Sequence, residues 1–257
     1  MSFFIEYMKL SMKDLFAYRF SFFLFLLIAI MEMAAFVVPF FLIYSVMEGF
    51  PGWTLYELFF FSVTNLLSWN ITNGFFFSGG TISSVVEDRE FDKFLLQPIN
   101  IFYNMFINGM HLKSTPDILL DITALLVIFP YLGIAFSWIN ILIYLFLILL
   151  SCLTLMGFSY IIASLSFFIT NTETLFDIFW IFKGSTDRPV NVYGKNFIVI
   201  FFTFILPFAL MNYYPVSIFL GKIDYSIIPL LITISLSVLL LGFFCLNYGL
   251  KHYKSAG

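Results

Sequence analysis

Acidic side chains inside apolar runs are the residues of this sequence whose type and position point most directly to chemistry. Glu32 is the only charged residue of the run 20–47. An ionised carboxylate in hydrocarbon is costly unless it is paired, so Glu32 is expected to face protein or water, or to be protonated. Two interpretations are open, a place on a substrate pathway or a packing contact between helices or subunits. For the second, the candidate partners are the asparagines of the next apolar run, Asn65, Asn70 and Asn73.

Asp117 and Asp121 form a second acidic pair, at the start of the apolar run 114–136. Residues four apart share one face of a helix, and like charges at that spacing repel each other slightly. Lys113, one turn earlier, is the nearest cation. Their expected depth is shallow, close to the cytoplasmic surface. We interpret the pair first as an interfacial anchor and second as a functional site.

The chain lacks the sequence pattern of an ATPase. No phosphate-binding loop of the type G-x-x-x-x-G-K-[ST] occurs, because Gly194-Lys195 has neither the preceding glycine nor the following hydroxyl. The chain is therefore not expected to hydrolyse ATP, and no cofactor is expected.

Metal-dependent and nucleophilic catalysis have equally little support. The two histidines, His111 and His252, lie far apart, and no H-E-x-x-H pattern is present, so no metal site is expected. Ser159 lies in an apolar run without a histidine to activate it, and a serine there is expected to bond to the backbone or to a neighbouring helix. We do not expect an enzyme.

The composition is that of a polytopic membrane protein. Charged residues make up 11% and hydrophobic residues 61% of the 257 residues, against about 25% and 45–50% in soluble domains. Mean hydropathy is +1.01. Cys152 and Cys245 both lie in apolar runs, so no disulfide is expected. A water-soluble enzyme is excluded.

The elements that must position these side chains are six apolar runs long enough to cross a bilayer. They cover residues 20–47, 55–77, 114–136, 141–169, 197–213 and 225–246. With this alternation, one side receives eleven of the twelve basic residues: Lys9, Lys13, Arg19, Arg89, Lys93, Lys113, Lys183, Arg188, Lys195, Lys251 and Lys254. Because loops rich in Lys and Arg stay cytoplasmic, both termini are expected in the cytoplasm. The expected fold is all-α, one membrane domain over 1–257, in which 170–195 is an inner loop and Trp53 lies at the outer surface.

Two inner segments have amphipathic patterns. Residues 1–18 alternate large apolar and charged side chains at helical spacing, which predicts a helix lying flat in the interface. Residues 87–98 are the most charged stretch of the chain and carry apolar residues at helical spacing up to Pro98. They predict a short helix lying against the membrane, with its charged face toward the cytosol.

Four motifs resemble those of type-2 ATP-binding-cassette (ABC) exporter permeases, in the uncharacterised six-span subfamily. The first, D-x-x-L-L-x-P, matches Asp92, Leu95, Leu96 and Pro98, although Arg89 stands where the family commonly has Gly and Gln97 where it has Arg. The others are Arg188-Pro189 followed by Tyr193, an outer motif, and a closing G-L-x-x-Y-x-S-A-G at 249–257. The outer motif consists of Pro207, Asn212, Tyr213, Pro215 and Gly221.

The resemblance implies an exporter subunit without ATPase activity, whose partners are a separate cytoplasmic ATPase and a second permease chain, the same or a sister. It also implies a multi-pass protein of the cell membrane, the inner membrane of a bacterium, surrounded by lipid and without a nucleic-acid partner. The segment that would dock on the ATPase comprises Glu87, Asp88, Arg89, Glu90, Asp92 and Lys93. Two alternatives stay open: an ion-driven secondary transporter or channel with Glu32 as its protonatable group, and a non-transporting scaffold or immunity protein.

Overall fold

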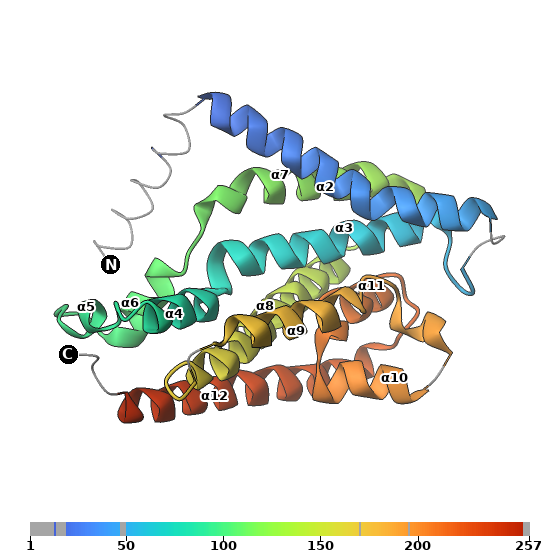
Figure 1. Ribbon diagram of the computed structural model, residues 1–257. Helices are drawn as coiled ribbons and strands as arrows, with labels where there is room; N and C mark the ends of the chain where they lie inside the picture. The colour runs from blue at the N-terminus through green and yellow to red at the C-terminus, as the bar shows by residue number, and fades with distance from the viewer. Residues whose placement is uncertain (1–12, 14–18, 47–49, 170, 195, 254–257) are drawn as a thin grey trace.

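The structure is a computed structural model that describes residues 13, 19–46, 50–169, 171–194 and 196–253. In this part of the chain all regular structure is helical, and no β-strand forms (Figure 1). The all-α class is therefore confirmed. Apart from Lys13, the expected interfacial helix 1–18 lies outside the described residues.

Four helical stretches are long and apolar enough to cross a membrane, or five if one bent pair is counted. They lie on α2 (Arg19–Val46), α7 (Thr115–Ile128) with the 3-10 turn η3 (Phe129–Leu132), α8 (Trp138–Leu165), and α12 (Ile228–His252) with the turn η7 (Tyr225–Ile227). Over half of the α8 stretch is buried, against 11% of the α2 stretch. Helix α8 is therefore more deeply buried than α2; α8 packs mainly on α12, whereas α2 and α7 pack on α3 (Leu55–Ile71) and on each other.

Glycine lets α8 and α12 pack at backbone distance. A Cβ atom on Gly242 would lie 2.4 Å from the carbonyl oxygen of Gly157, so neither position has room for a side chain. The Thr154 hydroxyl donates to Ser235 Oγ at 2.9 Å across the same interface. Small residues and interhelical hydrogen bonds are what hold helices together where lipid removes the hydrophobic driving force.

The buried helix α3 (Leu55–Ile71) continues through the π-turn η1 (Thr72–Phe76) into α4 (Ser78–Glu87). Thr54 and Glu57 start α3 with a reciprocal capping box, in which each side chain accepts a hydrogen bond from the other residue's backbone N–H. Beyond α4 follow α5 (Asp92–Leu95), α6 (Ile101–Asn108) and the 3-10 turn η2 (Leu112–Ser114). These short helices gather at one end of the molecule, where α12 also ends (Figure 1).

The short helix predicted over 87–98 is not continuous. Helix α4 ends at Glu87, Arg89 adopts a left-handed φ of 62°, and α5 has only four residues. A left-handed residue cannot continue a right-handed helix, so the segment turns sharply instead of lying as one amphipathic rod.

The expected inner loop 170–195 instead contains helix α9 (Glu173–Gly184) and the turn η4 (Val190–Tyr193). Together they run alongside α3. Asn65 Nδ2 donates to Asp187 Oδ1 at 2.7 Å, and Trp53 Nε1 donates to Asn191 Oδ1 at 3.2 Å. Trp53 was expected outside and Asn191 inside. Since residues in contact lie at the same level, these two expectations contradict each other, and 170–195 is not a loop confined to the inner face.

The span expected over 197–213 is broken at Pro207. Helix α10 (Asn196–Ile200) with the π-turn η5 (Phe201–Ile205) meets η6 (Phe208–Leu210) and α11 (Tyr213–Phe219) at a bend of 87° around Pro207. After α11 the chain returns to its starting point, because Lys222 Nζ lies 4.1 Å from the centre of the Trp53 ring. The segment between Asn191 and Lys222 therefore enters and leaves at the same end of α3.

Candidate functional site

Three carboxylates meet between α2, α3 and α7. Glu32, Asp117 and Asp121 line one small space together with Asn70, and that space has almost no free volume. Asn70 Nδ2 donates to Asp121 Oδ2 at 2.8 Å, and Asp121 is only 2% exposed. The structure thus brings together acids that are far apart in sequence, and Asp121 is buried among helices instead of anchoring the chain at the surface.

Of the three asparagines expected as partners of Glu32, Asn70 lines this space, whereas Asn65 is bonded to Asp187. Among the described residues no three His, Cys, Asp or Glu side chains are placed to hold a metal ion. Ser159 Oγ donates to the backbone oxygen of Met156 at 2.8 Å, which is the structural role expected for it.

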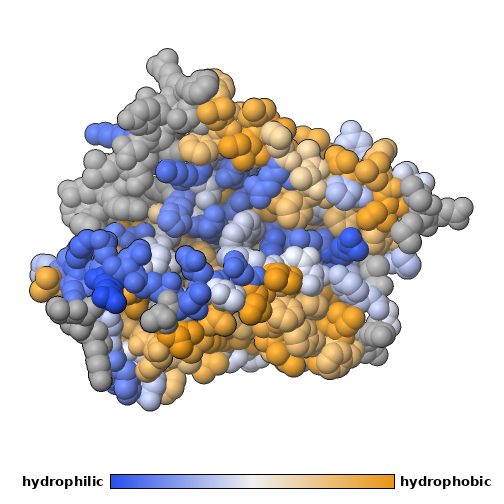
Figure 2. Space-filling model, viewed as in Figure 1, coloured by the Kyte–Doolittle hydropathy of each residue, from blue (hydrophilic) through white to orange (hydrophobic). Residues whose placement is uncertain are grey.

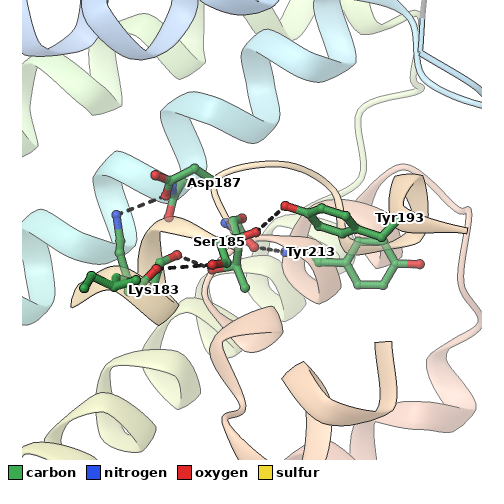
Figure 3. Close-up of polar contacts among 9 residues, drawn as sticks. Lys183, Ser185, Asp187, Tyr193 and Tyr213 are labelled. Atoms are coloured by element: carbon green, nitrogen blue, oxygen red, sulfur yellow. Dashed lines mark hydrogen bonds and ion pairs between the residues drawn. The ribbon is translucent and has the colours of Figure 1, made fainter. Parts of the chain in front are cut away.

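A second polar network, which the sequence reasoning missed, joins the end of α9 to α3 (Figure 3). Lys183 Nζ lies 3.2 Å from Asp187 Oδ1, and Lys183 is only 9% exposed. The ammonium also lies 5.4 Å and 5.8 Å from the ring centres of Phe36 and Trp69. An ion pair with aromatic neighbours lowers the cost of a buried lysine. The sequence contains one signal of this pair: Lys183 and Asp187 are four residues apart, the spacing of an ion pair on one face of a helix. The pattern of apolar runs instead predicts a loop there.

The turn that follows α9 is held by backbone acceptors. Tyr193 donates its hydroxyl proton to the Ser185 carbonyl oxygen at 2.7 Å (Figure 3), and Asn212 Nδ2 donates to the Thr186 carbonyl at 2.8 Å. Residues 185 and 186 are thereby tied both to η4 and to the start of α11. This positions Asp187 and Arg188 against α2.

A cavity of about 250 Å³ opens between α2 and that turn. Its lining residues are Ala35, Phe36, Pro39, Phe40, Ile43, Asp187 and Arg188. On the face shown in Figure 2, hydrophilic residues form a band across the middle of the molecule, with hydrophobic surface above and below. Polar surface at the depth of the hydrocarbon core is unsuited to contact with lipid, so the band marks a face that water or protein must cover.

The residues that the sequence resemblance suggests for docking lie at the end of α4, on α5 and on the turn between them, and Glu87 joins this turn to α9. Its carboxylate oxygen Oε1 accepts a hydrogen bond from the Thr172 backbone N–H at 2.6 Å and another from the Thr172 hydroxyl. Thr172 is the residue that precedes the first turn of α9. A carboxylate there stabilises the helix start, because backbone N–H groups and the positive end of the helix dipole face it.

Phe91 anchors the same turn in the protein. Its side chain is 1% exposed, and its ring centre lies 5.3 Å from that of Phe167 at the end of α8 and 4.9 Å from that of Tyr253 after α12. Burial raises the pKa of the Tyr253 hydroxyl above its ordinary value near 10, and the adjacent Asp92 carboxylate adds to the shift because its charge disfavours a phenolate. One buried ring therefore connects the turn to two long helices.

The outer side of the turn faces solvent. Leu96 is 84% exposed and Leu95 is 52% exposed, while Asp88 and Arg89 are also exposed. Lys93 Nζ pairs with Glu90 Oε1 at 2.6 Å on the surface. We call residues 88–96 the coupling segment. It exposes charged side chains of both signs and two leucines, and the buried side chain of Phe91 holds it against the protein.

A sequence model of the family described as ABC-2 family transporter protein matches residues 29–257. The chain belongs to this family. It is thus a multi-pass integral membrane protein and a membrane permease of an ABC transporter, in agreement with the resemblance seen in its motifs. No curated protein and no solved structure matches the chain.

Two of the polar regions described above are the cavity beside α2 and the coupling segment. Permeases of ABC transporters are in general non-catalytic, so neither region needs to perform bond chemistry.

Proposed function

We propose that this ABC-2 permease is the pathway-forming subunit of an exporter, driven by a separate cytoplasmic ATPase that docks on the coupling segment. The observation that carries the proposal is the buried side chain of Phe91, since it ties an otherwise exposed segment to α8 and to the end of α12. A loop serving only as a connection between helices needs no such anchor.

Movement of the coupling segment would be transmitted to the rest of the protein through three sets of contacts. Phe91 contacts the ends of α8 and α12, Glu87 holds the start of α9, and α4 leads directly into α3 through η1. When the ATPase subunits close on ATP, displacement of the segment would shift all of these helices together. Different contacts in two states convert the binding energy of ATP into alternating access.

We further propose six crossings, made by α2, α3, α7, α8, α9 with η4, and α12, while 196–219 forms a re-entrant pair of helices. The support is the contact of both Asn191 and Lys222 with Trp53. Six crossings keep both termini on one side, and Arg89, Lys93 and Lys251 place that side in the cytoplasm. The cell membrane, a bacterial inner membrane, is the expected location.

The transporter is proposed to contain two permease chains, identical or sister, with the hydrophilic band of Figure 2 turned toward the partner. A polar band at bilayer depth is covered in this way, and the route between the two chains acquires a polar wall.

The test is charge reversal in the coupling segment of the reconstituted complex. Asp88→Lys, Arg89→Glu and Asp92→Lys are combined, and Asp224→Lys, at an exposed position near the Trp53 end of the molecule, serves as the matched control. We expect the triple variant to lose transport while vanadate-sensitive ATP hydrolysis becomes independent of substrate. Full coupling in the triple variant, or equal loss in the control, would refute the docking role.

A further inference from the structure

Charge and apolar surface meet in the cavity between α2 and the turn after α9. One wall is formed by Phe36, Pro39 and Phe40 of α2, and the other by Asp187 and Arg188. The cavity is therefore amphipathic, with an apolar side along α2 and a polar side with ionic groups.

This cavity lies at bilayer depth. Asp187 accepts a hydrogen bond from Asn65, which lies about ten residues, or about 15 Å, along α3 from its start at Leu55. Half of a hydrocarbon core of about 30 Å is the same distance. Arg188, the next residue, is thus held within the hydrocarbon region and not in a solvated loop.

The charges of the turn do not cancel. Lys183 neutralises Asp187 at 3.2 Å, and Asp187 is further occupied by Asn65. Arg188 is exposed, and no ion pair with it occurs in the part of the chain that the structure describes. A guanidinium exposed at this depth is costly unless it faces water or an anion.

We propose that this cavity binds the transported substrate, and that the substrate is an anionic amphiphile. Its carboxylate or phosphate lies on the Arg188 guanidinium, whose planar donors match two oxygens of either group. Its hydrocarbon chain lies along Phe36, Pro39 and Phe40. This assignment rests on the proposed function, since it names the substrate class of that pathway.

Arg188 is suited to select the class without immobilising the substrate. The apolar wall accepts any chain of suitable width, because dispersion and burial are not directional. The guanidinium then favours anions over uncharged or cationic head groups. The Lys183–Asp187 pair fixes the turn that carries Arg188 and is a positioning element; Asp187 lines the cavity, but its charge is neutralised by Lys183.

The test uses the purified permease in zwitterionic lipid nanodiscs without ATPase or nucleotide. The probes are a twelve-carbon alkyl phosphate that carries a diazirine in its chain and the matching uncharged alcohol. After illumination, mass spectrometry locates the labelled peptides. We expect the phosphate to label the peptides with residues 35–43 and 187–188, and the alcohol to label them weakly.

The variants separate charge from fold. Arg188→Gln should lower labelling by the phosphate about tenfold, the effect of losing one ionic hydrogen-bonding group, and leave labelling by the alcohol unchanged. Arg188→Lys should restore most of it. Ala35→Trp, which fills the cavity, should abolish labelling by both probes, whereas Lys251→Gln, a cation at the end of α12, should change neither. Thermal unfolding confirms that each variant is folded.

Labelling of Arg188→Gln at the wild-type level would overturn the proposal, as would equal labelling by phosphate and alcohol in the wild type. Because no ATPase is present, these results are independent of the coupling experiment. A permease that couples normally but does not prefer the phosphate retains the proposed function and loses the proposed substrate class.

Discussion

The indole Nε1 of Trp53 donates a hydrogen bond to Oδ1 of Asn191 at 3.2 Å, across 138 positions of sequence. On its other side, Lys222 lies over the same ring and pairs with Glu57 at 2.8 Å. Trp53 thus marks both the point where the chain enters the 196–219 segment and the point where it leaves. This relationship supports the proposed order of the crossings.

Cysteine accessibility checks that order. In a background with Cys152 and Cys245 replaced by serine, Asn191→Cys and Lys222→Cys should react with a membrane-impermeant maleimide from the outside of intact cells. Arg89→Cys should react only after permeabilisation, because it lies at the opposite end of the molecule. Protection of position 191 in intact cells, together with labelling of 222, would restore a full crossing between them.

The long helices α2, α8 and α12 were predictable from the sequence because they contain few polar or charged residues. Composition does not distinguish a broken crossing at 196–219 from the proposed re-entrant pair, since both are equally apolar, and the support for the second comes from the two contacts of this region with Trp53. Helix α9 was mistaken for a loop because Lys183 and Asp187 appear as separate charges in sequence and as one neutralised pair in space.

The acidic cluster of the candidate site was not predictable either, because it depends on contacts between helices that are distant in sequence. The sequence shows Glu32, Asp117 and Asp121 as acids in apolar runs, but their meeting depends on how α2 and α7 pack on α3. Sequence spacing describes one helix at a time. The proposed coupling segment carries the motif that suggested it, whereas periodicity could not distinguish its anchor, Phe91, from the exposed neighbours.

Gly242→Ala tests the close packing of α8 on α12. The added methyl group would lie 2.4 Å from the Gly157 carbonyl oxygen, so the helices must separate. We expect a loss of about 1–3 kcal/mol in unfolding free energy, typical of overpacked cores. Ser237→Ala, at an exposed position of the same helix, is the control and should have no effect in thermal unfolding.

Glu87→Ala tests the link between the coupling segment and α9. It removes the acceptor of the Thr172 backbone N–H and hydroxyl, so about 1 kcal/mol of stability should be lost, as for other N-terminal caps. For a chain of this size that corresponds to about 2–4 °C in Tm. Substrate stimulation of ATPase activity should fall as well. Asp177→Ala, at an exposed acid of α9 itself, should retain both, and an unchanged Glu87→Ala protein would exclude the link.

Glu32→Gln distinguishes a pathway from a packing role. Since the space around Glu32, Asp117 and Asp121 has almost no free volume, we expect transport to be retained. Removal of one of three like charges should also raise the Tm. Asp121→Ala should lower the free energy of unfolding by about 1–3 kcal/mol, because it leaves the buried Asn70 amide without its acceptor. A folded Glu32→Gln protein without transport would assign this acid to the pathway.

The central claim, that an ATPase docks on the coupling segment, is tested most directly by a photoreactive amino acid at Leu96, which is 84% exposed. The matched control carries it at Leu240, which is 68% exposed on α12. Illumination of membranes containing the assembled transporter should join position 96, and not position 240, to the ATP-binding subunit. Absence of that product at position 96, or equal yields at both positions, would contradict the account.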